Sequence, residues 1–367
     1  LAQRIAEQTP GDLNRIFFTT GGSTAVDSAL RLCQLASNIQ SKPHRKHILT
    51  REKAYHGSTF LSASVTGKER DKSAMDTIKE GIHFLSAPCH FYHPEFATEE
   101  AFCDFLIEEL EQKILDVGAD NIMCFIAEPI LASGGVIVPP ANYNQRCWQT
   151  VKKHGITYIA DEVVTGFGRL GHWFASEAVF GVVPDMIIFA KGVTSGYIPM
   201  GGYAVSETFL ATFSGDNAEG CLYSNGYTWG GSPIACAAAL TSWDIIEREN
   251  LLTHVHQIGP YFQQQLRTLK NIPLVGDVRG QGLMAAVEMT VEGRNEEDLL
   301  AKDYAIGDMV DQHCQQLGLL VRPFINICII SPPLIITKQQ VDELVSTLRL
   351  GLELTLNDLR EQGIWID

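Results

Sequence analysis

The first two-thirds of the sequence alternates short apolar runs with stretches of helical spacing, and few folds accommodate that alternation. The runs are rich in Ile, Phe and Val and short enough for strands. One run alone could belong to a buried helix, but six runs, each followed by turn or polar residues, favour strands. They lie at residues 16–18, 47–49, 122–127, 157–160, 186–190 and 202–205. The pattern predicts an α/β fold, a sheet with helices on both faces.

The pattern changes after the alanine-rich stretch 233–240. From there the spacing predicts a long helix, a hairpin-like stretch, a second helix, an apolar strand at 319–323 and a final helix from Lys338. A chain of 367 residues also exceeds the usual size of one hydrophobic core. We therefore predict two domains, a large one over residues 1–245 and a smaller α+β domain over 246–367.

Charge and cysteine usage exclude several classes of protein. The net charge of −15 argues against nucleic acid or an anionic membrane as a partner. None of the nine cysteines has C-x-x-C spacing, so we predict no metal site and no redox motif. No stretch approaches 18 uninterrupted apolar residues, so no membrane span is expected. Single cysteines inside apolar runs are typical of reduced, buried thiols, and we expect a cytoplasmic protein.

Glycines and hydroxyl residues follow the first apolar run, before a predicted helix. In open α/β sheets, ligands bind beyond the carboxyl ends of the strands. Gly21 and Gly22 stand where backbone N–H groups at a helix N-terminus can bind an anion, and Ser23 adds a hydroxyl. A plain turn between a strand and a helix would have a similar sequence.

An aromatic residue and two carboxylates follow three further runs. Tyr55 and His56 come after the run 47–49, where an aromatic ring can stack on a planar ligand or simply join the core. Glu128 and Asp161 directly end their runs, so each carboxylate is expected to be partly buried and to need a donor. A structural salt bridge would suffice for Glu128. A protonated ring nitrogen would suit Asp161.

Lys191 directly follows the apolar run 186–190, which is an uncommon place for a lysine. An amine withdrawn from water there suits Schiff-base chemistry, although a lysine can also extend from a strand end into solvent. Lys191 follows Asp161 by 30 positions, enough for one β-α-β excursion to the same sheet edge. A lysine for an aldehyde, an acid for a ring nitrogen, an aromatic for a ring face and a glycine turn for a phosphate together describe pyridoxal 5′-phosphate (PLP).

The segments that carry these residues resemble the class III (ω-type) aminotransferases, which are fold-type-I PLP enzymes. The resemblance covers nearly the whole chain and is closest in pattern to the amine or ω-amino acid:pyruvate transaminases. It implies a large domain with a mixed, mostly parallel sheet. The segments concerned are 17–30, 55–58, 127–130, 134–140, 161–169, 189–192, 228–240, 279–288 and 319–337.

The resemblance assigns roles around the cofactor. Lys191 would hold PLP as a Schiff base and move the proton, and Asp161 would pair with the ring nitrogen. Val163 and Tyr55 would pack on the two ring faces. The remaining cofactor residues would be Gly22 and Ser23 at the phosphate, His56, Glu128 behind the ring near Asp161, and Thr228 from a neighbouring subunit. A residue supplied by the neighbouring subunit implies a homodimer, and pairing of dimers into a tetramer stays open.

The chain departs from the family pattern at Ser133 and in the phosphate loop, and it matches the pattern at Arg322. Relatives that use 4-aminobutyrate or ornithine often carry a glutamate where this chain has Ser133, so a less charged pocket is expected here. Arg322 matches a mobile arginine that binds a substrate carboxylate by bidentate geometry, although it could also be a surface strand residue. Tyr55 would border the substrate as well as the ring. The phosphate loop reads GGST where many members read SGSE, and both keep the backbone donors.

The resemblance implies a ping-pong aminotransferase. An amine, diamine or ω-amino acid would be the donor, and a keto acid, pyruvate in our expectation, the acceptor. An aminomutase, racemase or decarboxylase could use the same residues. The sequence begins at Leu1, and by the resemblance we expect an opening segment, which lines the substrate pocket of family members, to be missing from it. A cofactor-binding homologue without turnover is therefore the further alternative.

Overall fold

The computed structural model describes residues 1–213, 218–290 and 299–365, with side chains omitted at 299–302. The chain forms two compact units. The N-terminal unit comprises Leu1–Gly134, Pro139–Gly168 and His172–Asn250, and the C-terminal unit comprises Gly135–Val138, Arg169–Gly171 and Leu251–Asp367. The main division falls after Asn250, within the range 245–256 that the change of sequence pattern allows for the end of the large domain. Asn250 has a φ of +53° and separates helix α9 (Pro233–Arg248) from helix α10 (Leu251–Arg267).

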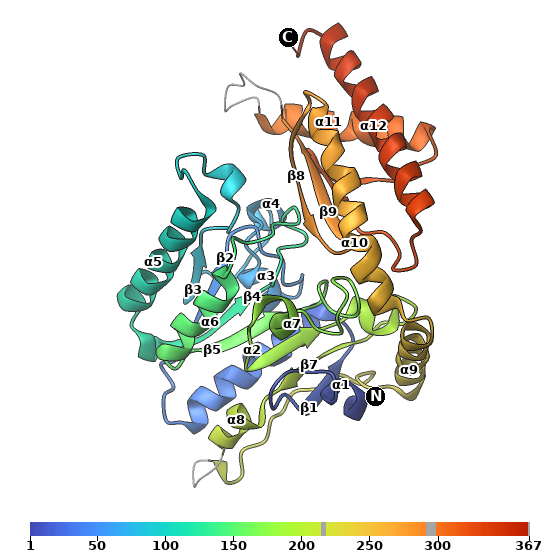
Figure 1. Cartoon of the computed structure of the whole chain (residues 1–367). Coiled ribbons are helices and arrows are strands. Elements are labelled where there is room, and N and C mark those ends of the chain that lie inside the picture. Colours follow the sequence, from blue (N-terminus) through green and yellow to red (C-terminus); the bar gives the residue numbers. More distant parts are fainter. Residues whose placement is uncertain (214–217, 291–298, 366–367) are drawn as a thin grey trace. The chain divides into compact units, whose positions relative to one another are not determined.

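The N-terminal unit is built on a seven-stranded sheet with the order β1-β7-β6-β5-β4-β2-β3 (Figure 1). The strands from β6 to β3 run parallel, and β7 is antiparallel to both of its neighbours. The predicted α/β fold with a mostly parallel mixed sheet is confirmed. The strands are β1 (Arg15–Thr19), β2 (His47–Arg51), β3 (Ile82–Leu85), β4 (Ile122–Ala127), β5 (Thr157–Asp161), β6 (Met186–Phe189) and β7 (Gly201–Val205).

Strand β3 was not predicted from the sequence. It has four residues, lies at the edge of the sheet and buries only Leu85 fully, so its apolar signal is weak. The central strands are buried on both faces, which explains their continuous apolar runs.

Helices pack against both faces of this sheet. Successive strand residues point to opposite faces, so Phe125 joins a core with α5 and α6, whereas Cys124 and Ile126 join a core with α2. The helices of the unit are α1 (Ala2–Ala6), α2 (Gly22–Ile39), α3 (Phe60–Val65), α4 (Glu69–Lys72), α5 (Glu99–Val117), α6 (Tyr143–Lys153), α7 (Ser176–Phe180), α8 (Glu207–Leu210) and α9.

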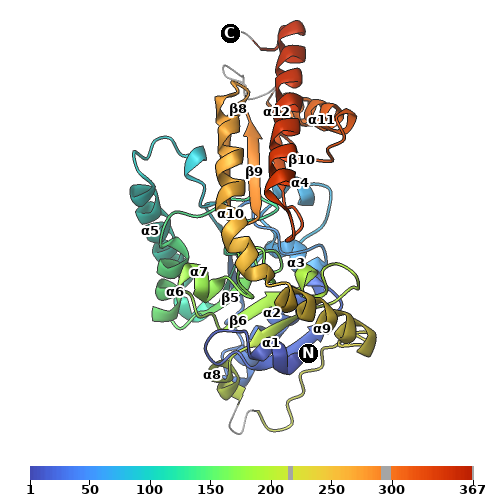
Figure 2. The same ribbon diagram turned by 45° about the vertical axis from the view of Figure 1, so that its right-hand side comes forward.

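The C-terminal unit contains a four-stranded antiparallel sheet with the order β10-β11-β9-β8, and helices α10 and α12 (Lys338–Glu361) run alongside the strands (Figure 2). The hairpin of β8 and β9 turns at Gly282, whose φ is +56°. The apolar strand predicted at 319–323 is instead the short β10, followed by β11. The elements are α10, β8 (Val275–Gln281), β9 (Met284–Met289), α11 (Leu299–Gln316), β10 (Arg322–Phe324), β11 (Ile327–Ile330) and α12 (Lys338–Glu361).

All nine cysteines are free thiols, and seven of them are buried. Within the described ranges, no three metal-binding side chains gather into a cluster. No helix in the described part of the chain has the length and apolar content needed to cross a membrane.

Candidate active site

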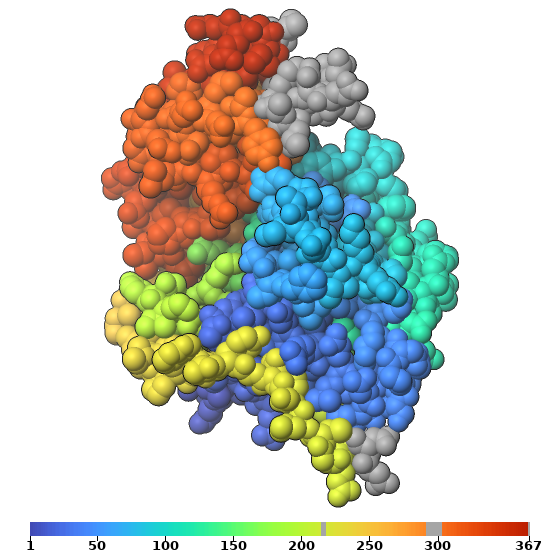
Figure 3. Space-filling view, turned by 180° about the vertical axis from the view of Figure 1, so that it is seen from behind, coloured from blue at the N-terminus to red at the C-terminus, as the bar shows by residue number. Residues whose placement is uncertain are grey.

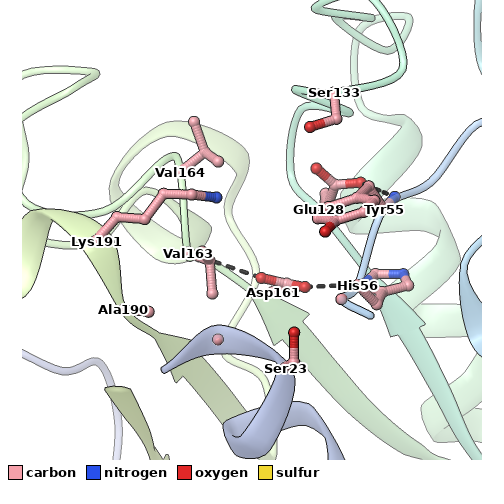
Figure 4. Close-up of a pocket in the computed structure, with 12 residues that line it drawn as sticks. Ser23, Tyr55, His56, Glu128, Ser133, Asp161, Val163, Val164, Ala190 and Lys191 are labelled. Atoms are coloured by element: carbon pink, nitrogen blue, oxygen red, sulfur yellow. Dashed lines mark hydrogen bonds and ion pairs between the residues drawn. The ribbon is translucent and has the colours of Figure 1, made fainter. Parts of the chain in front are cut away.

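One pocket opens where β1, β2, β4, β5 and β6 end or just beyond, and it gathers nine of the residues singled out from the sequence (Figure 4). Its volume is about 160 Å³. The nine residues are Gly22, Ser23, Tyr55, His56, Glu128, Ser133, Asp161, Val163 and Lys191. Gly57, Val164 and Ala190 complete the lining and were not singled out. Each of these three adjoins a chosen residue in the chain, which is the signal that could have found them.

Asp161 and His56 form a buried pair at the base of the pocket. His56 Nδ1 lies 2.7 Å from Asp161 Oδ2, and the His56 and Asp161 side chains are 0% and 4% exposed. An ionised carboxylate only accepts hydrogen bonds, so Nδ1 carries the shared hydrogen. Asp161 Oδ1 accepts a second bond from the backbone N–H of Val163 at 3.1 Å. A carboxylate offers about four lone-pair sites, so Asp161 can accept a further hydrogen bond from a ligand.

The first turn of α2 forms an anion-binding end of the pocket. Gly21 precedes this 18-residue helix and no side chain caps its N-terminus, so the first N–H groups and the helix dipole face a potential anion. Ser23 Oγ accepts the backbone N–H of Ser58 at 3.1 Å. The Ser23 hydroxyl hydrogen is thereby left to donate to a ligand. Ser58 was not singled out from the sequence.

Gly57 packs directly on this turn. A Cβ at Gly57 would lie 2.5 Å from Ser23 Oγ and 2.8 Å from Ser23 Cα, and the φ of Gly57 is +135°. The backbone of α2 cannot move away without displacing the anion-binding turn itself. Glycine is therefore required here both by its backbone conformation and by the close approach.

Lys191 begins a 3₁₀ helix directly after the buried residues of β6 and Ala190. Its φ of +38° is in the left-handed region, which costs a non-glycine residue about 1–3 kcal/mol and is concentrated at functional sites. The side chain reaches into the pocket from the side opposite Tyr55 and Glu128 (Figure 4). Contrary to the burial suggested by the sequence, Lys191 is exposed in this single chain, because its side chain leaves the sheet edge toward the open pocket.

Two buried glutamates flank the pocket with different partners. Burial raises the pKa of Glu128, whose carboxylate accepts the backbone N–H groups of Tyr55 and Ala132, and the nearby Asp161 adds to that rise. Burial also raises the pKa of Glu162, next to Asp161 in the chain. Glu162 does not line the pocket. Its carboxylate accepts bonds from Thr165, Ala175 and Ser176, tying the end of β5 to the start of α7.

Two of the predicted site residues do not line the pocket. Thr228 lies in an exposed turn of the segment 218–230, which crosses α2 on the surface of the N-terminal unit (yellow in Figure 3). Arg322 is exposed at the start of β10, in the C-terminal unit. Sequence proximity to strand ends could not place either residue, because neither follows a strand of the large sheet.

The pocket suits PLP by the chemistry of its donors. The open N-terminus of α2 and the Ser23 hydroxyl would hold the phosphate, and Asp161 has acceptor capacity for a ring N–H. Val163 and Tyr55, both half-buried, border the space between these ends. Lys191 Nζ is the amine of the pocket. These residues therefore fit the cofactor expected from the sequence.

Substitution of Gly57 with alanine should weaken PLP binding by about 10- to 100-fold, the equivalent of 1–3 kcal/mol of overpacking. The added methyl group would press on the α2 turn that receives the phosphate. Titrating apoprotein with PLP and following absorbance measures the change. Gly155→Ala is the matched control, because Gly155 has a φ of +65° but no atom near its Cβ position. Equal PLP affinity in wild type and Gly57→Ala would show that the phosphate does not bind at this turn.

Several known proteins are similar to this chain in sequence and in fold. A family profile described as aminotransferase class-III matches residues 1–352. The chain is 37% identical over 356 residues to a putrescine–pyruvate aminotransferase of Pseudomonas aeruginosa, covering 97% of this chain and 76% of that protein. It is 35% identical over 348 residues to gamma-aminobutyrate transaminase 1 of Oryza sativa subsp. indica, covering 95% and 67%.

A solved structure has the same fold as this chain. The crystal structure of a thermostable (S)-enantioselective ω-transaminase from Thermomicrobium roseum superposes with a TM-score of 0.91 at 35% identity, covering 97% of this chain and 78% of that one. The sequence resemblance to class III is thus confirmed along the chain. The protein belongs to the class-III aminotransferases, a family of PLP-dependent enzymes.

Proposed function

We propose that the protein transfers an amino group from a terminal amine, diamine or ω-amino acid to pyruvate by a ping-pong mechanism. The observation that carries the proposal is the single pocket that unites the Lys191 amine, the buried Asp161–His56 pair and the open N-terminus of α2. The relatives named putrescine–pyruvate aminotransferase and gamma-aminobutyrate transaminase support a terminal amine as donor.

The chain's own residues supply positioning and proton transfer. Bound PLP supplies an electron-poor ring that accepts negative charge next to the amino carbon. Lys191 Nζ would hold the cofactor at rest and, once the substrate's amine has replaced it there, would move the proton at the carbon that carries the amine. Asp161, whose carboxylate is held by His56, would keep a hydrogen on the ring nitrogen. Gly22 and Ser23 would hold the phosphate and so limit rotation of the cofactor.

The lining of the pocket supports a donor whose second polar group is not paired with a fixed charged side chain. Ser133 provides a hydroxyl where some relatives provide a carboxylate, and Val163 and Val164 add apolar surface. We assign Arg322 the binding of the keto acid's carboxylate, which a guanidinium can hold with two parallel bonds.

We also propose a homodimer in which Thr228 reaches the phosphate of a second copy. Support comes from the exposed turn that holds Thr228 and from its neighbour Trp229, a large apolar residue that is 75% exposed in the single chain.

We further propose a cytoplasmic location, because free thiols are in keeping with a reducing setting.

A donor panel tests the function. With pyruvate as acceptor, putrescine and 4-aminobutyrate should form alanine, and isotope from the donor's amino group should appear in it. Each donor alone should bleach the absorbance of the bound cofactor, since a ping-pong enzyme completes one half-reaction without the acceptor. Product that retains the donor's label would indicate an aminomutase, racemase or decarboxylase. A folded, PLP-loaded protein that no amine bleaches would indicate a homologue without turnover.

A further inference from the structure

We infer that Glu128 is a positioning residue whose carboxylate joins two walls of the substrate pocket and thereby sets the place of Tyr55 and Ser133. One wall is the segment 53–56 after β2, and the other is the segment 128–134 after β4. We call the contact between them the Glu128 bridge. Its link to substrate binding rests on the proposed function, whereas its geometry does not.

Each carboxylate oxygen of Glu128 serves one wall. Oε1 accepts the backbone N–H of Tyr55 at 2.9 Å, and Oε2 accepts the backbone N–H of Ala132 at 3.0 Å. Glu128 is 4% exposed, so water does not compete for these bonds. Tyr55 and Ser133, the residue after Ala132, both line the pocket, and Figure 4 shows them on the same side as Glu128. One side chain therefore determines the separation of two lining residues.

Strand β2, which precedes the first wall, in turn holds the backbone of Glu128. Arg51, the last residue of β2, donates from Nη2 to the carbonyl oxygen of Glu128. Strands β2 and β4 are parallel neighbours, so the two strand ends exchange bonds in both directions. Arg51 is fully buried, and its Nε and Nη1 have no hydrogen-bond partner in the described part of the chain. Burying a cation with unpaired N–H groups costs folding free energy. We infer that the burial of Arg51 serves to fix both strand ends.

The two walls also touch directly. A Cβ at Gly134 would lie 2.4 Å from the carbonyl oxygen of Lys53. Only a glycine permits this approach. The contact lies one residue beyond Ser133 in one wall and two residues before Tyr55 in the other. The Glu128 bridge and the Gly134 contact thus hold the same pair of segments at two points.

Loss of the bridge should affect substrate binding more than proton transfer. Lys191 lies just beyond β6, and Asp161 ends β5. Asp161 does bond to His56 of the first wall, but the backbone N–H of His56 is held by Thr66 Oγ1 and not by Glu128. The competing role is electrostatic, because Glu128 lies near both Asp161 and His56. That role would act on the cofactor's electronic state and leave the walls in place. The two roles predict different measurements.

The test compares Glu128→Gln with wild type. Glutamine keeps the shape of the side chain, but its amide nitrogen cannot accept a hydrogen bond, so one wall is released. In the apoprotein, hydrogen–deuterium exchange should rise about tenfold in the peptide that covers Tyr55 or the one that covers Ala132. In the PLP-loaded enzyme, the KM for putrescine should rise about tenfold, with kcat changed less than threefold.

Glu109→Gln is the matched control. Glu109 also accepts a backbone N–H, that of Ser86 at 3.0 Å, but it does not line the pocket. Both oxygens of Glu109 accept this one N–H, so the amide oxygen of glutamine can still accept it. This control should leave both the exchange at Ser86 and the KM close to wild type. If Glu128→Gln does not fold, Glu128→Asp is measured instead, since its shorter side chain cannot span both walls.

Three results would overturn the inference. Unchanged exchange at both Tyr55 and Ala132 would show that the carboxylate holds neither wall. Faster exchange with an unchanged KM would show that the walls do not set substrate binding. A changed pH dependence of the cofactor's absorbance with an unchanged KM would assign Glu128 to the electrostatic role. If wild type does not use putrescine and pyruvate, the proposed function fails, and the apoprotein exchange still decides whether the bridge exists.

Discussion

Replacing Lys191 with alanine is expected to lower the transamination rate by about 10⁴-fold or more, because the pocket would lose both its covalent attachment point and its proton-transferring amine. The fold should survive, since the Lys191 side chain extends into the pocket and is exposed rather than packed in the core. The melting temperature of the apoprotein should stay close to that of the wild type, because an exposed side chain contributes little packing. Steady-state rates and a thermal melt measure the two effects.

Borohydride reduction makes the assignment of Lys191 specific. In wild type, reduction should fix the cofactor to the peptide that contains Lys191, whereas Lys191→Ala should bind PLP only reversibly. Lys53→Ala is the control, because Lys53 is an exposed lysine of the pocket's neighbouring loop that does not line the pocket. Recovery of the label on another lysine in wild type would refute the role of Lys191.

The strand ends were predictable because burial leaves a strong mark in the sequence. The central strands are covered on both faces, so each appears as an apolar run, and the first polar residue after each run lies at the sheet edge. Asp161, Glu128 and Lys191 were all found in this way. Which of them contact one another was not predictable, because that depends on strand order rather than on sequence order.

Other features left no usable mark in the sequence. The bond between His56 and Asp161 joins residues 105 positions apart, and the two bonds of the Glu128 bridge use backbone N–H groups that every non-proline residue carries. The close approach of Gly57 to Ser23 depends on how two loops fold over each other. The break at Asn250 has neither glycine nor proline to signal it.

Asparagine at position 161 should reduce kcat/KM by about 10²- to 10⁴-fold. The side chain would keep its shape and could still accept from His56, but it would lose the negative charge that keeps a hydrogen on the ring nitrogen. Removing one partner of a buried charge pair costs about 3–5 kcal/mol, and each 1.36 kcal/mol of barrier is tenfold in rate. The pH dependence of the bound cofactor's absorbance should change at the same time, since that nitrogen would lose its anionic partner.

A second buried aspartate separates loss of charge at the ring from loss of a buried charge in general. Asp185 is 8% exposed, pairs with Lys152 at 2.7 Å and accepts the N–H of Tyr158, but it does not line the pocket. Asp185→Asn should therefore lower the melting temperature while leaving kcat/KM and the cofactor spectrum close to wild type. An Asp161→Asn enzyme within threefold of wild-type activity would mean that the ring nitrogen does not need this carboxylate. The His56–Asp161 pair would then be a structural element that lies beside the cofactor without acting on it.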